Sequence, residues 1–207
     1  MDADDLYPRR PSGRGGVALV TEQAVVWLQL LGGPPSLLTG MEFDEEGQRL
    51  TPTHAVKKGT RYRYYVPTSL ITGAGGGARR GGGRRIPAGD LEGLVIARLR
   101  AFFADPGAIL DAIDNETHNG SGCGELIERG RQLAEELAAD ATDKVRATLM
   151  ALLCRVEVGS DRIDIMLSRG RFAELLAGSI DLKMQHPEAT NAPGDILRLT
   201  APAGRKH

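Results

Sequence analysis

The sequence has few of the residues that build metal sites or disulfide frameworks. It contains only two cysteines, Cys123 and Cys154, which can form neither a disulfide framework nor a four-thiolate zinc site. Its four histidines are far apart, and there is no CxxC or HExxH motif. We therefore expect no metal, no cofactor and a reducing compartment.

Aromatic residues and long apolar runs are also scarce. Four Phe, four Tyr and one Trp occur in 207 residues, so a core must rest on Leu, Ile, Val and Ala. The longest mildly apolar stretch, Val17 to Leu31, is interrupted by polar residues and follows an acidic N-terminus. That pattern is typical of neither a signal peptide nor a membrane-spanning helix. We expect a cytoplasmic protein without a membrane partner.

Positive charge is concentrated in the middle of the chain, although the formal net charge is only -1. Between Gly47 and Gly89 there is no Asp or Glu, while the segment contains nine Lys and Arg residues. The flanking parts are acidic on balance. A cationic segment without counter-charges indicates either a polyanionic partner or a solvated surface with no special partner.

The composition divides the chain into five parts. Residues 1–36 mix Pro, Gly and Arg and are expected to be a poorly ordered leader. Residues 37–72 have the pattern of short strands, and 73–85 form a flexible Gly/Arg loop. Residues 86–178 contain helical patterns and a β-hairpin, and 179–207 are expected to be a loose tail with one short strand.

The strand region predicts two turns. Leu38 to Phe43 and Arg49 to Thr53 resemble a hairpin around Gly47, and Lys58-Gly59 forms a second turn. In the strand that follows, over 61–66, alternation places Arg61, Arg63 and Tyr65 on one face. Tyr62 and Tyr64 fall on the other face. The segment therefore predicts a small sheet with one basic face.

The remaining pattern is mostly helical. Apolar spacing predicts helices near 87–103, 106–113, 125–138 and 145–153, and the last two should fold back as an antiparallel pair. A β-hairpin over 156–167 and a short helix ending at Gly178 follow. We expect an α+β fold with a small β-ribbon-like sheet, a coiled-coil-like helical hairpin and a following β-hairpin.

The glycine-rich segment contains a weak GxGxxA match over 73–78. A nucleotide loop needs a helix directly after the glycines, whereas Arg79-Arg80 and further glycines follow here. No nucleophile elbow or local triad spacing is present. We expect no enzymatic activity, with a nucleotide-binding enzyme as the weaker alternative.

The cationic segment has the chemistry of a nucleic-acid surface. Lys and Arg neutralise phosphates, Thr and His donate hydrogen bonds to phosphate oxygens, and Tyr packs on sugars or bases. The opposing interpretation makes Tyr62 and Tyr64 core residues and the arginines a solvated strand edge. The predicted DNA-contacting residues are Thr51, Thr53, His54, Lys57, Lys58, Arg61, Arg63, Tyr65, Arg79, Arg80, Arg84 and Arg85.

Several stretches resemble the C-terminal region of the large serine site-specific recombinases, in the resolvase/invertase superfamily. The stretches are LLTG at 37–40, GQRLTPTHAVKKG at 47–59 and RYRYYV at 61–66. They resemble the zinc β-ribbon of that family in a variant without cysteines, so the resemblance does not imply a bound metal ion. The similarity continues through RRIPA at 84–88, the helices and RVEVG at 155–159.

The resemblance implies a DNA-recognition region whose helical hairpin helps recombinase subunits contact one another. The family's catalytic serine domain has no counterpart here, so we expect a truncated recombinase that binds duplex DNA without cutting it. One alternative is an interaction module whose helix pair, 125 to 153, docks on intact recombinase subunits. Another is a gene remnant without a present function.

Overall fold

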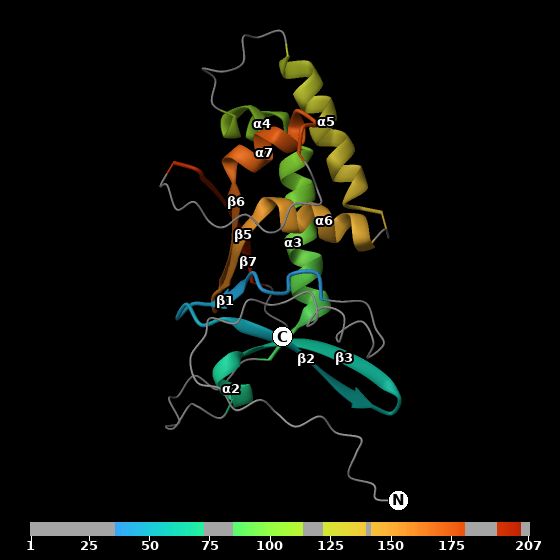
Figure 1. The fold of residues 1–207 in the computed structure, drawn as a ribbon, viewed down its shortest axis with the longest axis vertical. Coiled ribbons are helices and arrows are strands. Elements are labelled where there is room, and N and C mark those ends of the chain that lie inside the picture. Colours follow the sequence, from blue (N-terminus) through green and yellow to red (C-terminus); the bar gives the residue numbers. More distant parts are fainter. Residues whose placement is uncertain (1–35, 73–84, 114–121, 140–141, 181–193, 204–207) are drawn as a thin grey trace, which may run out of the picture. The chain divides into compact units, whose positions relative to one another are not determined.

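The computed structural model describes residues 36–72, 85–113, 122–139, 142–180 and 194–203 (Figure 1). From Ser36 onward the chain belongs to one compact unit. It combines helices with two separate sheets, which confirms the predicted α+β class. The predicted leader and nearly all of the Gly/Arg loop lie outside the described residues.

The first sheet is antiparallel and contains the predicted cationic strands. Its strands are β2 (Leu50–Lys57), β3 (Thr60–Pro67) and β4 (Ile86–Pro87), in the order β2-β3-β4. The turn between β2 and β3 consists of Lys58 and Gly59, with φ angles of 51° and 77°. Two-residue turns with both φ angles positive match the twist of the paired strands. The predicted Lys58-Gly59 turn is confirmed, and the short helix α2 (Thr68–Thr72) follows β3.

The second sheet joins segments that are far apart in sequence. Its strands are β1 (Glu42–Asp44), β5 (Leu153–Val158), β6 (Arg162–Ser168) and β7 (Ile196–Pro202), in the order β1-β5-β6-β7. The predicted hairpin of β5 and β6 is confirmed. The predicted turn before Arg49 forms, with Gly47 at a φ of 76° and an antiparallel bridge between Phe43 and Arg49. The predicted hairpin does not extend beyond that bridge, because β1 pairs in parallel with β5. The N–H of Val156 donates to the carbonyl of Met41 at 2.8 Å, a long-range bond that local pattern cannot reveal.

Five further helices complete the described structure. They are α3 (Ala88–Phe103), α4 (Pro106–Ala112), α5 (Cys123–Glu136), α6 (Thr142–Leu152) and α7 (Arg169–Leu176). The Asp105 side chain accepts from the backbone N–H groups of Gly107 and Ala108, so it caps α4. Ser168 caps α7 by accepting from the N–H of Arg171. These local signals explain where α4 and α7 begin.

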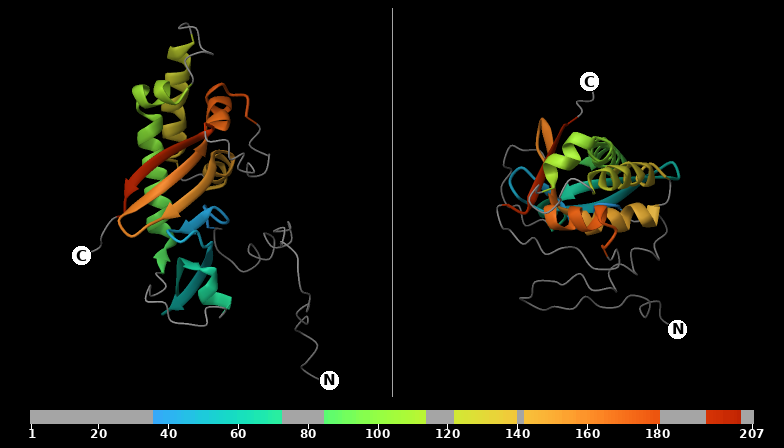
Figure 2. Two further views of the ribbon diagram at one scale, coloured as in Figure 1. Left: turned by 90° about the vertical axis from the view of Figure 1, so that its left-hand side faces the viewer. Right: turned by 90° about the horizontal axis from the view of Figure 1, so that it is seen from above.

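The helices pair differently from the prediction. Helix α5 packs against α3 and α4, and α6 contacts α7 (Figures 1 and 2). The buried Gly130 permits a close approach, since a Cβ there would lie 2.9 Å from the carbonyl oxygen of Phe103. The predicted antiparallel pair of α5 and α6 is therefore wrong. The amphipathic pattern showed that α5 has an apolar face, but it could not show which helix covers that face.

A single hydrophobic core connects the first sheet to the helices. Leu50 and Tyr65 of the sheet belong to the same buried cluster as Leu91 and Leu99 of α3. The rings of Phe102 and Phe172 add an aromatic contact at 5.2 Å between centroids. The sheet is thus held by packing against the helices. Within the described ranges, no helix has both the length and the apolar character needed to cross a bilayer.

Candidate nucleic-acid interface

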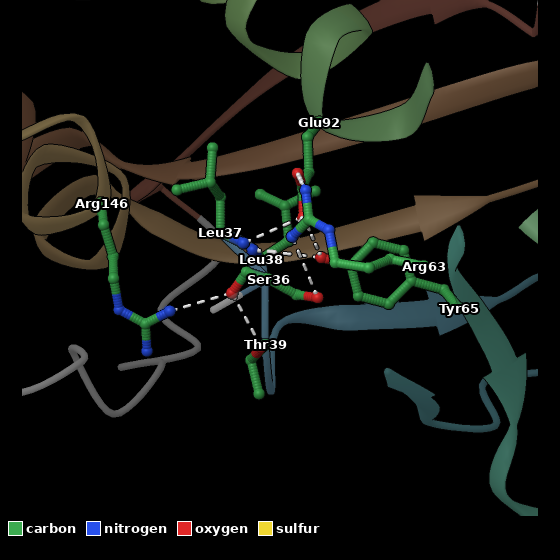
Figure 3. Close-up of polar contacts among 8 residues, drawn as sticks. All are labelled: Ser36, Leu37, Leu38, Thr39, Arg63, Tyr65, Glu92 and Arg146. Carbon is green, nitrogen blue, oxygen red and sulfur yellow. Dashed lines mark hydrogen bonds and ion pairs between the residues drawn. The ribbon is translucent and has the colours of Figure 1, made fainter. Parts of the chain in front are cut away.

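The base of the β2–β3 hairpin is fixed by a buried polar network (Figure 3). The hydroxyl of Tyr65 donates to Oε1 of Glu92 at 2.8 Å and accepts from the N–H of Leu38. The Arg63 guanidinium forms an ion pair with Oε2 of Glu92 at 3.0 Å. Oε1 of Glu92 also accepts from the N–H of Leu37 at 2.9 Å. The network therefore attaches β3 to α3 and to the segment that precedes β1.

This network changes the predicted roles of two residues. Tyr65 is fully buried, so its side chain does not lie on an exposed face and its prediction as a DNA contact is wrong. Arg63 is half-buried and engaged with Glu92, which places it at the anchor of the hairpin. The strand alternation is as predicted, but this part of the basic face points toward α3. The sequence could not reveal that a helix with a buried acid covers it.

The carboxyl of Glu42 lies in the same buried region. Its side chain is fully buried, and Oε2 accepts from the N–H of Gly40 at 3.0 Å. Burial raises the pKa of Glu42 to about 7, because the charged form loses its hydration. Burial, with Glu42 and Glu92 nearby, also raises the pKa of the Tyr65 hydroxyl well above its ordinary value. Sequence reasoning assigned no role to either glutamate.

The tip of the hairpin is exposed and cationic. Every residue from Ala55 to Tyr62 is exposed, including Lys57, Lys58 and Arg61. The Arg61 guanidinium lies 3.3 Å from Nδ1 of His54 on the neighbouring strand. Among the described residues, no acidic side chain forms an ion pair with Lys57 or Lys58. The tip therefore presents positive charge to solvent from a well-anchored base.

The other predicted contacts fall into three groups. Thr51 forms a 2.8 Å hydroxyl–hydroxyl hydrogen bond with Thr68, so it secures the start of α2. Thr53 is half-buried, whereas His54 and Arg85 are exposed near the same part of the sheet. The predicted contacts Arg79, Arg80 and Arg84 lie outside the described residues.

A hollow with both apolar and polar lining residues lies beside the hairpin and was not predicted. It has a volume of ≈ 190 Å³, and its lining includes Tyr64, Leu70, Ile71 and Arg85. Leu70 and Ile71 are 55% and 53% exposed. The only sequence signal was the pair of consecutive aliphatic residues directly before the glycine-rich segment.

Neither a metal site nor a similar known protein assigns a function to these residues. In the part of the chain that the structure describes, no group of three or more His, Cys, Asp or Glu side chains is arranged to hold a metal ion. Comparison with protein-family models, curated proteins and solved structures finds no match to this chain.

Proposed function

We propose that this chain binds duplex DNA through the β2–β3 hairpin, with Lys57, Lys58 and Arg61 contacting phosphates. The observation that carries the proposal is the exposed cationic tip on a base fixed by the Tyr65–Glu92 hydrogen bond. A two-stranded ribbon fits the major groove of B-DNA, which is about 12 Å wide. The hairpin therefore has both the charge and the dimensions for groove contact.

The anchored base of the hairpin favours binding because it reduces the conformational entropy that the hairpin loses on association. Residues held by packing and hydrogen bonds before association have less conformational entropy to lose when a partner arrives. Arg63 contributes here through its ion pair with Glu92, which orients β3. On binding, the exposed cations at the tip would release counterions from the phosphates.

The resemblance to large serine recombinases belongs to the same proposal. The two most specific stretches, 47–59 and 61–66, coincide with the β2–β3 hairpin and its approach. We propose that the chain recognises DNA in a recombination context and does not itself cleave strands. This proposal rests on the sequence stretches and on the exposed cations.

The alternative role as a module docking through the helix pair 125 to 153 has less support. Leu133 and Leu137, which would line that contact, are 1% and 4% exposed. They are already covered within the core. A Leu133→Glu, Leu137→Glu variant would therefore disrupt folding, so it cannot report on association.

A salt series tests the DNA proposal. Fluorescence anisotropy with a labelled duplex should show log K falling by about 0.9 per neutralised phosphate for each tenfold rise in salt. Replacing both lysines, Lys57→Gln with Lys58→Gln, should reduce that slope by about two and weaken binding to all sequences alike.

The matched control removes two cations from another surface. Arg131→Gln with Lys144→Gln makes the same change in net charge on α5 and α6, where both side chains are more than half exposed. This control should leave the slope nearly unchanged. Equal effects of the two double variants, or no binding at low salt, would refute the assigned surface.

A further inference from the structure

The hollow beside the hairpin has a mixed lining, in which Thr53, His54 and Arg85 supply polar and cationic groups. Its apolar lining residues include Tyr64, Val66, Leu70 and Ile71. Its volume of ≈ 190 Å³ is several times the roughly 30 Å³ that one water molecule occupies in the liquid. Phosphate contacts alone would not use its apolar part, so that part requires a separate explanation.

Two strongly exposed apolar side chains, Leu70 and Ile71, line this hollow. In the described part of the chain, the large apolar residues that are strongly exposed are Val56, Tyr62, Leu70 and Ile71. Tyr62 lies on the same face of the hairpin as Tyr64, whereas Val56 lies on the opposite face. Clustering of exposed apolar groups on one part of a surface indicates a binding role.

The charge around the hollow restricts the occupant. Arg85 is part of the lining, and no acidic side chain is present among the described lining residues. Strand register places Thr53 opposite Tyr64 and Lys57 opposite Thr60, so Lys57 lies on the same face of the hairpin as Tyr64. The occupant should therefore have an apolar flat part for Tyr64 and an anionic part for the cations. A nucleotide combines these two properties, since its base has π faces and its phosphate is negative.

We propose that the hollow receives one unpaired or extruded nucleotide of bound DNA. The base packs on Tyr64 and contacts Leu70 and Ile71, while Arg85 pairs with the adjacent phosphate. This inference rests on the proposed DNA-binding function. It adds contact with an unstacked base to the proposed contacts with the phosphates of the duplex. Unstacking costs less at a bulge or mismatch, so the site would favour distorted DNA.

Three labelled duplexes with the same flanking sequence test the inference by anisotropy. One is fully paired, one has a single bulged nucleotide, and one has an abasic residue in the bulge. Contact between a base and an aromatic side chain contributes roughly 5- to 100-fold in affinity. We expect the bulged duplex to bind at least about fivefold more tightly than the other two.

Variants then locate the preference on the protein. Leu70→Ser with Ile71→Ser should remove the preference for the bulge and leave affinity for the paired duplex unchanged. The control Val56→Ser removes an apolar side chain that is 65% exposed but is not part of the hollow, and it should keep the preference. Thermal unfolding of both variants checks that the fold is retained.

The outcomes separate the two proposals. Salt-dependent binding with equal affinity for the three duplexes would overturn the base site and leave the DNA-binding function standing. An equal loss of affinity for paired and bulged duplexes in the Leu70→Ser, Ile71→Ser variant would overturn the base site as well. Failure to bind any of the three duplexes would overturn both.

Discussion

The buried carboxyl of Glu42 predicts an unusual pH dependence of stability. Its side chain is fully buried, and one of its oxygens, Oε1, has no hydrogen-bond partner within the described structure. Burial raises the pKa of Glu42 from 4.5 to about 7. Folding therefore favours the neutral carboxyl. Glu42→Gln keeps the size of the side chain and makes it permanently neutral.

The sign and size of the effect follow from linkage. A carboxyl with a higher pKa in the folded state binds more protons when folded than when unfolded. Its contribution to the free energy of unfolding is therefore present at low pH and is lost as pH rises from about 4.5 to about 7. One pKa unit corresponds to 1.36 kcal/mol, so the loss is about 3 kcal/mol. Above about pH 7 the contribution should level off.

Urea denaturation of the wild type and Glu42→Gln at several pH values measures this loss. The two proteins should have similar stability near pH 4.5, and the variant should be about 3 kcal/mol more stable at pH 8. Using the difference between the two proteins cancels the titration of all other groups.

Glu128→Gln provides a control of opposite sign. The hydrogen bond from Arg131 lowers the pKa of Glu128, so any contribution of that carboxylate is lost as pH falls. The stability of the wild type relative to Glu128→Gln should therefore increase with pH in the acidic range. A constant difference between wild type and Glu42→Gln from pH 4.5 to 8 would refute the reasoning for Glu42.

Two further predictions concern packing and the anchor of the hairpin. Gly130→Ala should lower the free energy of unfolding by about 1–3 kcal/mol, because its Cβ would meet the Phe103 carbonyl, whereas Gly93→Ala in open space should raise it by about 0.5–1 kcal/mol. Denaturation curves for both variants check this, and changes of the same sign would contradict it. Tyr65→Phe should cost about 1–3 kcal/mol in the same assay, since Glu92 and the Leu38 N–H lose a buried partner. A neutral result would show that other groups take over those hydrogen bonds.

Much of the local structure could be predicted from the sequence. The Lys58-Gly59 turn and the β5–β6 hairpin appear where expected, and side-chain caps at Asp105 and Ser168 hold the starts of α4 and α7. Each of these depends on neighbours within a few residues, such as a positive φ or a side-chain oxygen near a free N–H. The exposed positions of Lys57, Lys58 and Arg61 also followed from the sequence, because strand alternation and a turn place charge at the tip.

Tertiary structure decided which surfaces are covered. Strand β1 pairs with β5, although the sequence predicted pairing with the adjacent segment, 49–53. Helix α5 packs on α3, although the sequence predicted pairing with α6. Arg63 and Tyr65 contact Glu92, which is 29 and 27 positions away in the sequence. The strand face that the sequence predicts to be a basic surface therefore attaches the hairpin to α3. The hollow at Tyr64 and Leu70 likewise exists only where β2, β3 and α2 meet. The physical reason is that periodicity determines which residues share a face, whereas burial depends on the element that packs against that face.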